Sequence, residues 1–178
     1  MKRICYAVAM SLDGYIAGPN GEADWIGMDP DVDFAQLWSR FDILLMGRKT
    51  YEMARTGFEQ FGTQGLEIVV ASRTLRREDA PKVTIISELT LDAITSLRVR
   101  AKKDIWLFGG GELFRSILNI GAVDSVEATV IPVLLRRASS AAELCAANQP
   151  EACGTQALSL WKNVVKVRRP ALMCCWIG

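Results

Sequence analysis

Histidine is absent from this chain of 178 residues. Without an imidazole, the protein cannot build the serine–histidine–aspartate or cysteine–histidine systems of nucleophilic catalysis, or the usual histidine-rich zinc sites, and no metal site is expected. An excess of positive charge is also missing, since 21 lysines and arginines face 20 aspartates and glutamates. This balance argues against a protein that neutralises many nucleic-acid phosphates. Hydride transfer with a bound cofactor survives these exclusions, because the cofactor carries the chemistry.

Long apolar runs and cysteine pairs with C-x-x-C spacing are missing too. No stretch approaches the roughly 20 apolar residues of a membrane helix. The short apolar run after Arg3 leads directly into Ser11-Leu12-Asp13-Gly14, with no convincing signal cleavage site. The five cysteines include no C-x-x-C pair, which is typical of thiols in a reducing cytosol. These features predict a soluble, cytoplasmic protein that binds neither membranes nor nucleic acid.

Apolar runs rich in strand formers alternate with amphipathic segments, and the chain is 50% apolar, enough for a sizeable core. Strands are expected at 3–10, 41–46, 66–71, 82–86, 104–108 and 123–135, the last interrupted by Pro132. Helices are expected at 31–40, 50–54, 91–101 and 112–120. This alternation predicts one α/β domain over residues 1–178, with a mainly parallel sheet covered by helices on both faces.

The tail from residue 136 to residue 178 departs from this pattern. Residues 138–157 are dominated by Ala, Ser, Cys, Gln and Asn, without a clean period. Two closing strands are expected at 164–167 and 172–177, most economically as an antiparallel hairpin.

Three turns that follow predicted strands are suited to binding phosphate. The glycines of Gly109–Gly111 let the backbone approach a ligand, and the helix after them offers unpaired N–H groups. Arg48 and Lys49 begin a helix, where they oppose its dipole unless an anion binds there. Ser72-Arg73 follows the third strand. If the sheet is parallel, all three turns lie at the carboxyl ends of strands, which together predicts a large phosphorylated ligand. Taken singly, a tight turn or a solvated basic turn would explain the first two.

Two acidic residues, Asp31 and Asp33, open the first predicted helix, just after a glycine-rich loop and Trp25. One of them could be a helix N-cap, the commonest reason for aspartate at such a position. Alternatively, one lies at the mouth of an apolar pocket and holds a proton or a nitrogen heterocycle. The spacing does not choose between these readings.

Six segments carry a resemblance to a known family: Ala9–Ala17, Asp24–Trp25, Met46–Glu52, Ala71–Arg73, Phe108–Phe114 and Ala128–Pro132. In this order they resemble the dihydrofolate reductase superfamily. The resemblance is closest to small stand-alone proteins related to the reductase domain of bacterial riboflavin-biosynthesis deaminase-reductases, and it covers about residues 3–135. It implies a three-layer, dihydrofolate-reductase-like fold, with a mostly parallel central sheet of about eight strands that binds NADPH across its carboxyl edge.

The resemblance also implies roles for individual residues. It suggests 2′-phosphate and adenosine-side contacts by Arg48, Ser72 and Arg73, and a nicotinamide lined by Ala9 and the lid-like loop Ile16-Ala17. The remaining cofactor positions, at the two helix starts, are Gly47, Lys49, Thr50, Gly109, Gly110, Gly111, Glu112 and Leu113.

On the substrate side, folate reductases keep one acid on the first helix, assisted by a threonine. By this resemblance Asp31 is the best match for the acid, Asp33 is second, and Thr129 fits the threonine, with Trp25 beside the substrate. Riboflavin-type reductases reduce a ribosyl carbon and depend less on that acid, and Asp13-Gly14 favours this branch. The expected reaction is therefore hydride transfer from NADPH to a small heterocycle, either a ribosylamino-pyrimidine or a dihydrofolate-like molecule.

Arg136-Arg137 stands where relatives have a glycine-rich turn. This departure supports a second reading, a non-catalytic nucleotide-binding module or a decayed reductase. A purely structural interaction protein would leave Arg48, Ser72, Arg73 and the triple glycine unexplained. Apolar surface at the sheet edge or in the tail would suit a homodimer.

Overall fold

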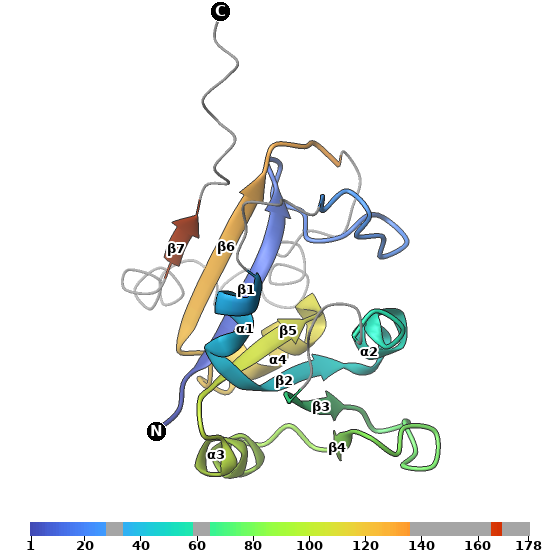
Figure 1. The fold of residues 1–178 in the computed structure, drawn as a ribbon, viewed down its shortest axis with the longest axis vertical. Helices are drawn as coiled ribbons and strands as arrows, with labels where there is room; N and C mark the ends of the chain where they lie inside the picture. The colour runs from blue at the N-terminus through green and yellow to red at the C-terminus, as the bar shows by residue number, and fades with distance from the viewer. Residues whose placement is uncertain (28–33, 59–64, 136–164, 169–178) are drawn as a thin grey trace, which may run out of the picture. The chain divides into compact units, whose positions relative to one another are not determined.

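The computed structural model describes residues 1–27, 34–58, 65–135 and 165–168 (Figure 1). They divide into two compact units, which are described separately. The first unit holds residues 1–6 and the described part of 33–125, and the second holds the described parts of 7–32 and 126–178. Asp31 and Asp33, and the expected strand at 172–177, lie outside the described residues.

The first unit is built on parallel strands. Its strands are the start of β1 (Ile4–Ser11), β2 (Phe41–Gly47), β3 (Glu67–Ala71), β4 (Thr84–Ile86) and β5 (Asp104–Gly109), in the order β4-β3-β2-β5-β1. Its helices are α1 (Phe34–Ser39), α2 (Arg48–Ala54), α3 (Leu91–Arg100) and α4 (Gly111–Asn119). Every pairing among these strands is parallel, and the arrows of β2, β3 and β5 point the same way in Figure 1. The predicted parallel α/β architecture is confirmed.

Helices cover both faces of this sheet. Neighbouring residues of a strand point to opposite faces, so Trp106 and Leu107 of β5 mark one face each. Trp106 packs against Trp38 of α1, with ring centroids 4.7 Å apart. Tyr6, which pairs in register with Leu107, stacks on Phe114 of α4. The consequence is visible in β2, where four consecutive residues, Ile43 to Met46, are buried without polar alternation.

The second unit contains the rest of β1, the loop that follows it, β6 (Ser125–Ile131) and β7 (Val165–Arg168). β7 pairs with β6 in parallel, from Val126 opposite Val165 to Thr129 opposite Arg168. β6 is shorter than the predicted strand at 123–135, because Pro132 lacks the N–H that a ladder needs. With β6 and β7 the hydrogen-bonded order becomes β4-β3-β2-β5-β1-β6-β7, so the described sheet has seven strands against about eight predicted.

Tyr6 buries a polar group in the core of the first unit. Its ring is 2% exposed and stacks on Phe114 with centroids 4.1 Å apart. Within the described residues its hydroxyl has no hydrogen-bond partner. Burial raises the pKa of Tyr6 well above its ordinary value. The side chain therefore carries an unsatisfied hydroxyl that strongly resists ionisation.

Tyr6→Phe is expected to stabilise the protein by about 1 kcal/mol at pH 8, because it keeps the ring stack and removes the unsatisfied hydroxyl. Above about pH 10 the advantage grows, since the unfolded wild type gains stability by ionising this tyrosine while the folded form cannot. Urea unfolding of both proteins at the two pH values measures the difference. A variant less stable than wild type at pH 8 would show that the hydroxyl has a partner.

Candidate functional site

The carboxyl ends of β3, β2 and β5 lie side by side. Gly47 pairs with Ala71 of β3, and Met46 pairs with Gly109 of β5. The turns that begin at Ser72, Arg48 and Gly110 therefore emerge from adjacent strands at one edge of the first unit. This is the arrangement that the sequence predicted for its three phosphate-suited turns, and it is the edge at which open α/β sheets bind ligands.

Glycines stand where two of these turns meet, and a Cβ at either Gly47 or Gly110 would make ordinary van der Waals contact. A Cβ on Gly110 would lie 3.4 Å from the Oγ1 of Thr50, and one on Gly47 would lie 3.9 Å from the carbonyl oxygen of Gly109. Gly109 has a φ of 140°, a conformation that L side chains rarely adopt, and the Gly109–Gly110 peptide bond is cis. Gly47 and Gly110 are the N-cap residues of α2 and α4, and neither makes a side-chain cap. The first backbone N–H groups of both helices therefore have no side-chain cap as acceptor.

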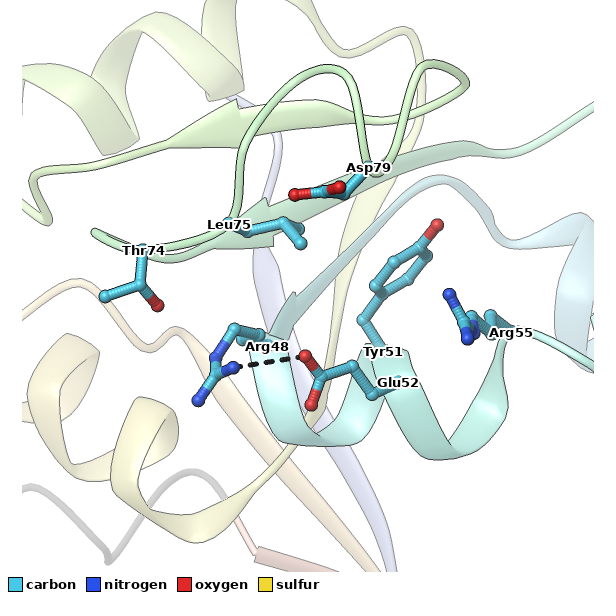
Figure 2. A pocket seen from close by; sticks show the side chains of 7 residues that line it. All are labelled: Arg48, Tyr51, Glu52, Arg55, Thr74, Leu75 and Asp79. Carbon is cyan, nitrogen blue, oxygen red and sulfur yellow. Dashed lines mark hydrogen bonds and ion pairs between the residues drawn. The ribbon is translucent and has the colours of Figure 1, made fainter.

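A cavity of about 360 Å³ opens between α2 and the loop after β3 (Figure 2). Its walls are seven side chains: Arg48, Tyr51, Glu52, Arg55, Thr74, Leu75 and Asp79. The first three lie on one face of α2, Arg55 is the C-cap residue of the same helix, and the other three come from the loop. Aromatic and aliphatic groups thus stand next to two guanidinium groups, a combination that suits a flat base linked to phosphate.

Arg48 is the predicted site residue that the cavity contains. Its guanidinium lies 3.2 Å from a carboxylate oxygen of Glu52, one helical turn further along, and both side chains are nearly half exposed. An exposed pair at this spacing is worth only about 0.3–0.5 kcal/mol. Arg48 can therefore be drawn to an incoming anion at little energetic cost.

Ser72 shapes the loop that forms the opposite wall. Its Oγ accepts hydrogen bonds from the backbone N–H groups of Thr74 at 3.2 Å and Leu75 at 3.0 Å. Its own N–H donates to the carbonyl of Ile86, at the end of β4, over 2.9 Å. Ser72 thus fixes the positions of two cavity-lining residues, and Arg73 is exposed on the same turn.

The other predicted cofactor positions of this unit are split between surface and core. Lys49 and Glu112 are exposed at the starts of α2 and α4. Leu113 is only 6% exposed, and its side chain belongs to the core. Gly111, the first residue of α4, is buried as well.

The second unit carries the remaining described candidates. Ala9 lies on β1, Ile16 and Ala17 lie in the loop after it, and Thr129 lies on β6. The indole N–H of Trp25 donates to the carbonyl of Glu22 over 3.1 Å.

The motif Ser11–Tyr15 holds the start of this loop in place. The buried Ser11 hydroxyl donates to Asp13 over 2.6 Å and accepts from the backbone N–H of Tyr15 over 2.9 Å. Asp13 also accepts the backbone N–H of Leu135 at 3.1 Å. Gly14 supplies the positive φ, 87°, that the turn needs. The motif thus ties the loop after β1 to the segment after β6.

Sequence reasoning missed most of the cavity lining, namely Tyr51, Glu52, Arg55, Thr74, Leu75 and Asp79. One signal was present: Tyr51, Glu52 and Arg55 follow Arg48 at intervals of three, four and seven residues, which places them on one helix face. Nothing comparable marks the loop residues, because their approach to α2 depends on packing between separate segments.

No group of three or more carboxylate or cysteine side chains in the described ranges is arranged to hold a metal ion. Among these same residues, no helix is long and apolar enough to cross a membrane.

Comparisons with known proteins agree with the observed fold. The model of the RibD C-terminal domain family matches residues 2–140. The chain is 32% identical over 145 residues to the uncharacterized protein YyaP of Bacillus subtilis, covering 75% of this chain and 77% of YyaP.

Two solved structures show the likeness in three dimensions. A Shewanella sp. PV-4 protein described as a riboflavin biosynthesis protein is similar with a TM-score of 0.66 and 28% identity, over 79% of this chain and 82% of that one. The Thermotoga maritima diaminohydroxyphosphoribosylaminopyrimidine deaminase/5-amino-6-(5-phosphoribosylamino)uracil reductase has a TM-score of 0.61 and 16% identity, over 79% of this chain and 47% of that one. The resemblance drawn from the sequence is confirmed: the chain belongs to the RibD C-terminal domain family.

Proposed function

We propose that the protein is an NADPH-dependent reductase that transfers a hydride to a small heterocycle of the ribosylamino-pyrimidine type. The observation that carries this proposal is the cavity lined by Arg48 and Arg55 at the carboxyl edge of the sheet, next to the glycine turn. Membership of the RibD C-terminal domain family and the uracil reductase named in the Thermotoga protein support the substrate class.

The residues at this edge fit the adenosine half of NADPH. Tyr51 and Leu75 offer apolar walls to a flat base, and Arg48 and Arg55 offer N–H groups to a phosphate. The glycine turn, where Gly110 stands close to Thr50, leaves room for backbone to approach the pyrophosphate. The cofactor, when bound, supplies the hydride; the protein binds and orients both reactants.

The heterocyclic substrate would be bound by Trp25, Asp31 and Asp33. Either aspartate, assisted by Thr129, would hold a proton next to the heterocycle. Ala9, Ile16 and Ala17 would line the nicotinamide and exclude water from it.

Separate calorimetric titrations with NADPH and with NADH test the proposal. We expect NADPH to bind about tenfold more tightly or better, because only its 2′-phosphate can use the arginines of the cavity. Consumption of NADPH with 5-amino-6-(5-phosphoribosylamino)uracil, and with dihydrofolate as comparator, then tests turnover. Tight NADPH binding without turnover of either substrate would favour a non-catalytic nucleotide-binding module. If neither cofactor binds, the proposal is overturned.

A further inference from the structure

The cavity at the carboxyl edge contains two acids as well as two arginines. Glu52 pairs with Arg48 at 3.2 Å, and Asp79 lies across the cavity on the loop (Figure 2). Arg48 and Glu52 both face the cavity and both remain 44–45% exposed. The lining is therefore close to electrically balanced, which is unusual for a site that is to receive a phosphate dianion.

Glu52 and a phosphate at this cavity would use the same donors. A guanidinium presents a planar fork that one carboxylate or one phosphate can engage in two-point fashion. The Arg48–Glu52 pair is exposed and spans one helical turn, so it is weak enough for a phosphate to displace. After displacement, the Glu52 carboxylate would still lie within a few ångströms of the phosphate and repel it.

We infer that Glu52 is a specificity-determining residue, which competes with the 2′-phosphate of the cofactor for Arg48 and so narrows the preference for NADPH over NADH. This inference rests on the proposed function. It implies that ligands without a 2′-phosphate leave the Arg48–Glu52 pair intact, so that their affinity does not depend on the Glu52 carboxylate.

Binding of 2′,5′-ADP and 5′-AMP to wild type and to Glu52→Gln tests the inference, since these probes differ in the 2′-phosphate and need no turnover. We expect Glu52→Gln to bind 2′,5′-ADP about three- to tenfold more tightly, because Arg48 is released from the competing carboxylate and one repulsive charge at close range is removed. Its affinity for 5′-AMP should stay within about twofold of wild type. The gain should shrink at high salt, because the charges are partly exposed.

Two further variants isolate the mechanism. Glu78→Gln removes the same charge from an exposed residue next to the cavity that does not line it, and should change neither affinity appreciably. In an Arg48→Met background no guanidinium is left to compete for, so Glu52→Gln should keep only the part of its gain that comes from repulsion and should improve 2′,5′-ADP binding less than in wild type; an equal or larger gain would show that repulsion alone, without competition, explains the effect. A thermal melt of each variant verifies folding.

The outcomes separate the two claims. If wild type binds 2′,5′-ADP better than 5′-AMP but Glu52→Gln is unchanged or weaker, Glu52 does not compete, and only this inference is overturned. If wild type shows no preference for 2′,5′-ADP, the proposed NADPH site fails and the inference falls with it.

Discussion

Leu107→Ala is expected to lower the free energy of unfolding by about 3–5 kcal/mol. Leu107 is fully buried on β5, between Tyr6 of β1 and Leu45 of β2 in register. Truncation removes three side-chain carbons from a position that neighbouring strands hold on both sides. Because a hydrogen-bonded sheet relaxes little, most of the resulting cavity would remain open, which places the cost toward the upper part of the range seen for such substitutions.

Urea unfolding followed by tryptophan fluorescence measures this cost. Leu91→Ala is the matched control, since Leu91 lies in the same unit but is 57% exposed at the start of α3. Its change should stay within about 0.5 kcal/mol. Similar losses in the two variants would mean that the face of β5 that carries Leu107 is not the core.

The strands of the first unit were predictable because each can be recognised from its own residues, without knowledge of the strand that pairs with it. A strand buried on both faces appears as a continuous apolar run, and Ile43–Met46 and Ile105–Phe108 are such runs. Their predicted bounds differ from the observed ones by at most two residues. The order of the strands was not predicted, because it depends on contacts between segments that lie far apart in the sequence.

Only the part of the candidate site that follows directly from neighbouring residues in the sequence was predicted. Arg48, Ser72 and the glycines stand directly after strands, so a parallel sheet gathers them at one edge whatever the details of packing. The cavity itself depends on the side-to-side placement of α2 and the loop after β3. Leu75 and Asp79 belong to no motif: Ser72 holds the backbone of Leu75 by accepting its N–H, and the N–H of Asp79 donates to the carbonyl of Arg76 over 3.2 Å.

A residue's position in a family motif also proved an incomplete guide to its role. Leu113 shares the glycine-turn motif with Gly110, yet its side chain packs in the core. Asp13, a mark of the family branch in the sequence, is used for loop structure through Ser11 and Leu135.

Arg48→Met is expected to weaken NADPH binding by about 30- to 100-fold, if NADPH binds at this cavity as proposed. The variant keeps an unbranched, apolar stem on α2 while it removes the charge and all the N–H donors. A phosphate bound there would then face Glu52 and Asp79 with Arg55 as the remaining cavity cation. The loss should therefore exceed the value of one neutral hydrogen bond, because part of it is the repulsion of an incompletely compensated dianion.

The same substitution should change NADH binding by less than about threefold, since the adenosine ribose of NADH brings no phosphate to this guanidinium. Lys102→Met is the control for net charge. Lys102 is exposed two residues before β5, at the opposite end of that strand, and its loss should change neither affinity by more than a change of one unit in net charge does at the same salt concentration. Calorimetric titration of both cofactors into the three proteins gives the comparison. Equal losses for NADPH and NADH would place Arg48 on a phosphate that the two cofactors share, and would move the 2′-phosphate site to Arg73 on the neighbouring turn.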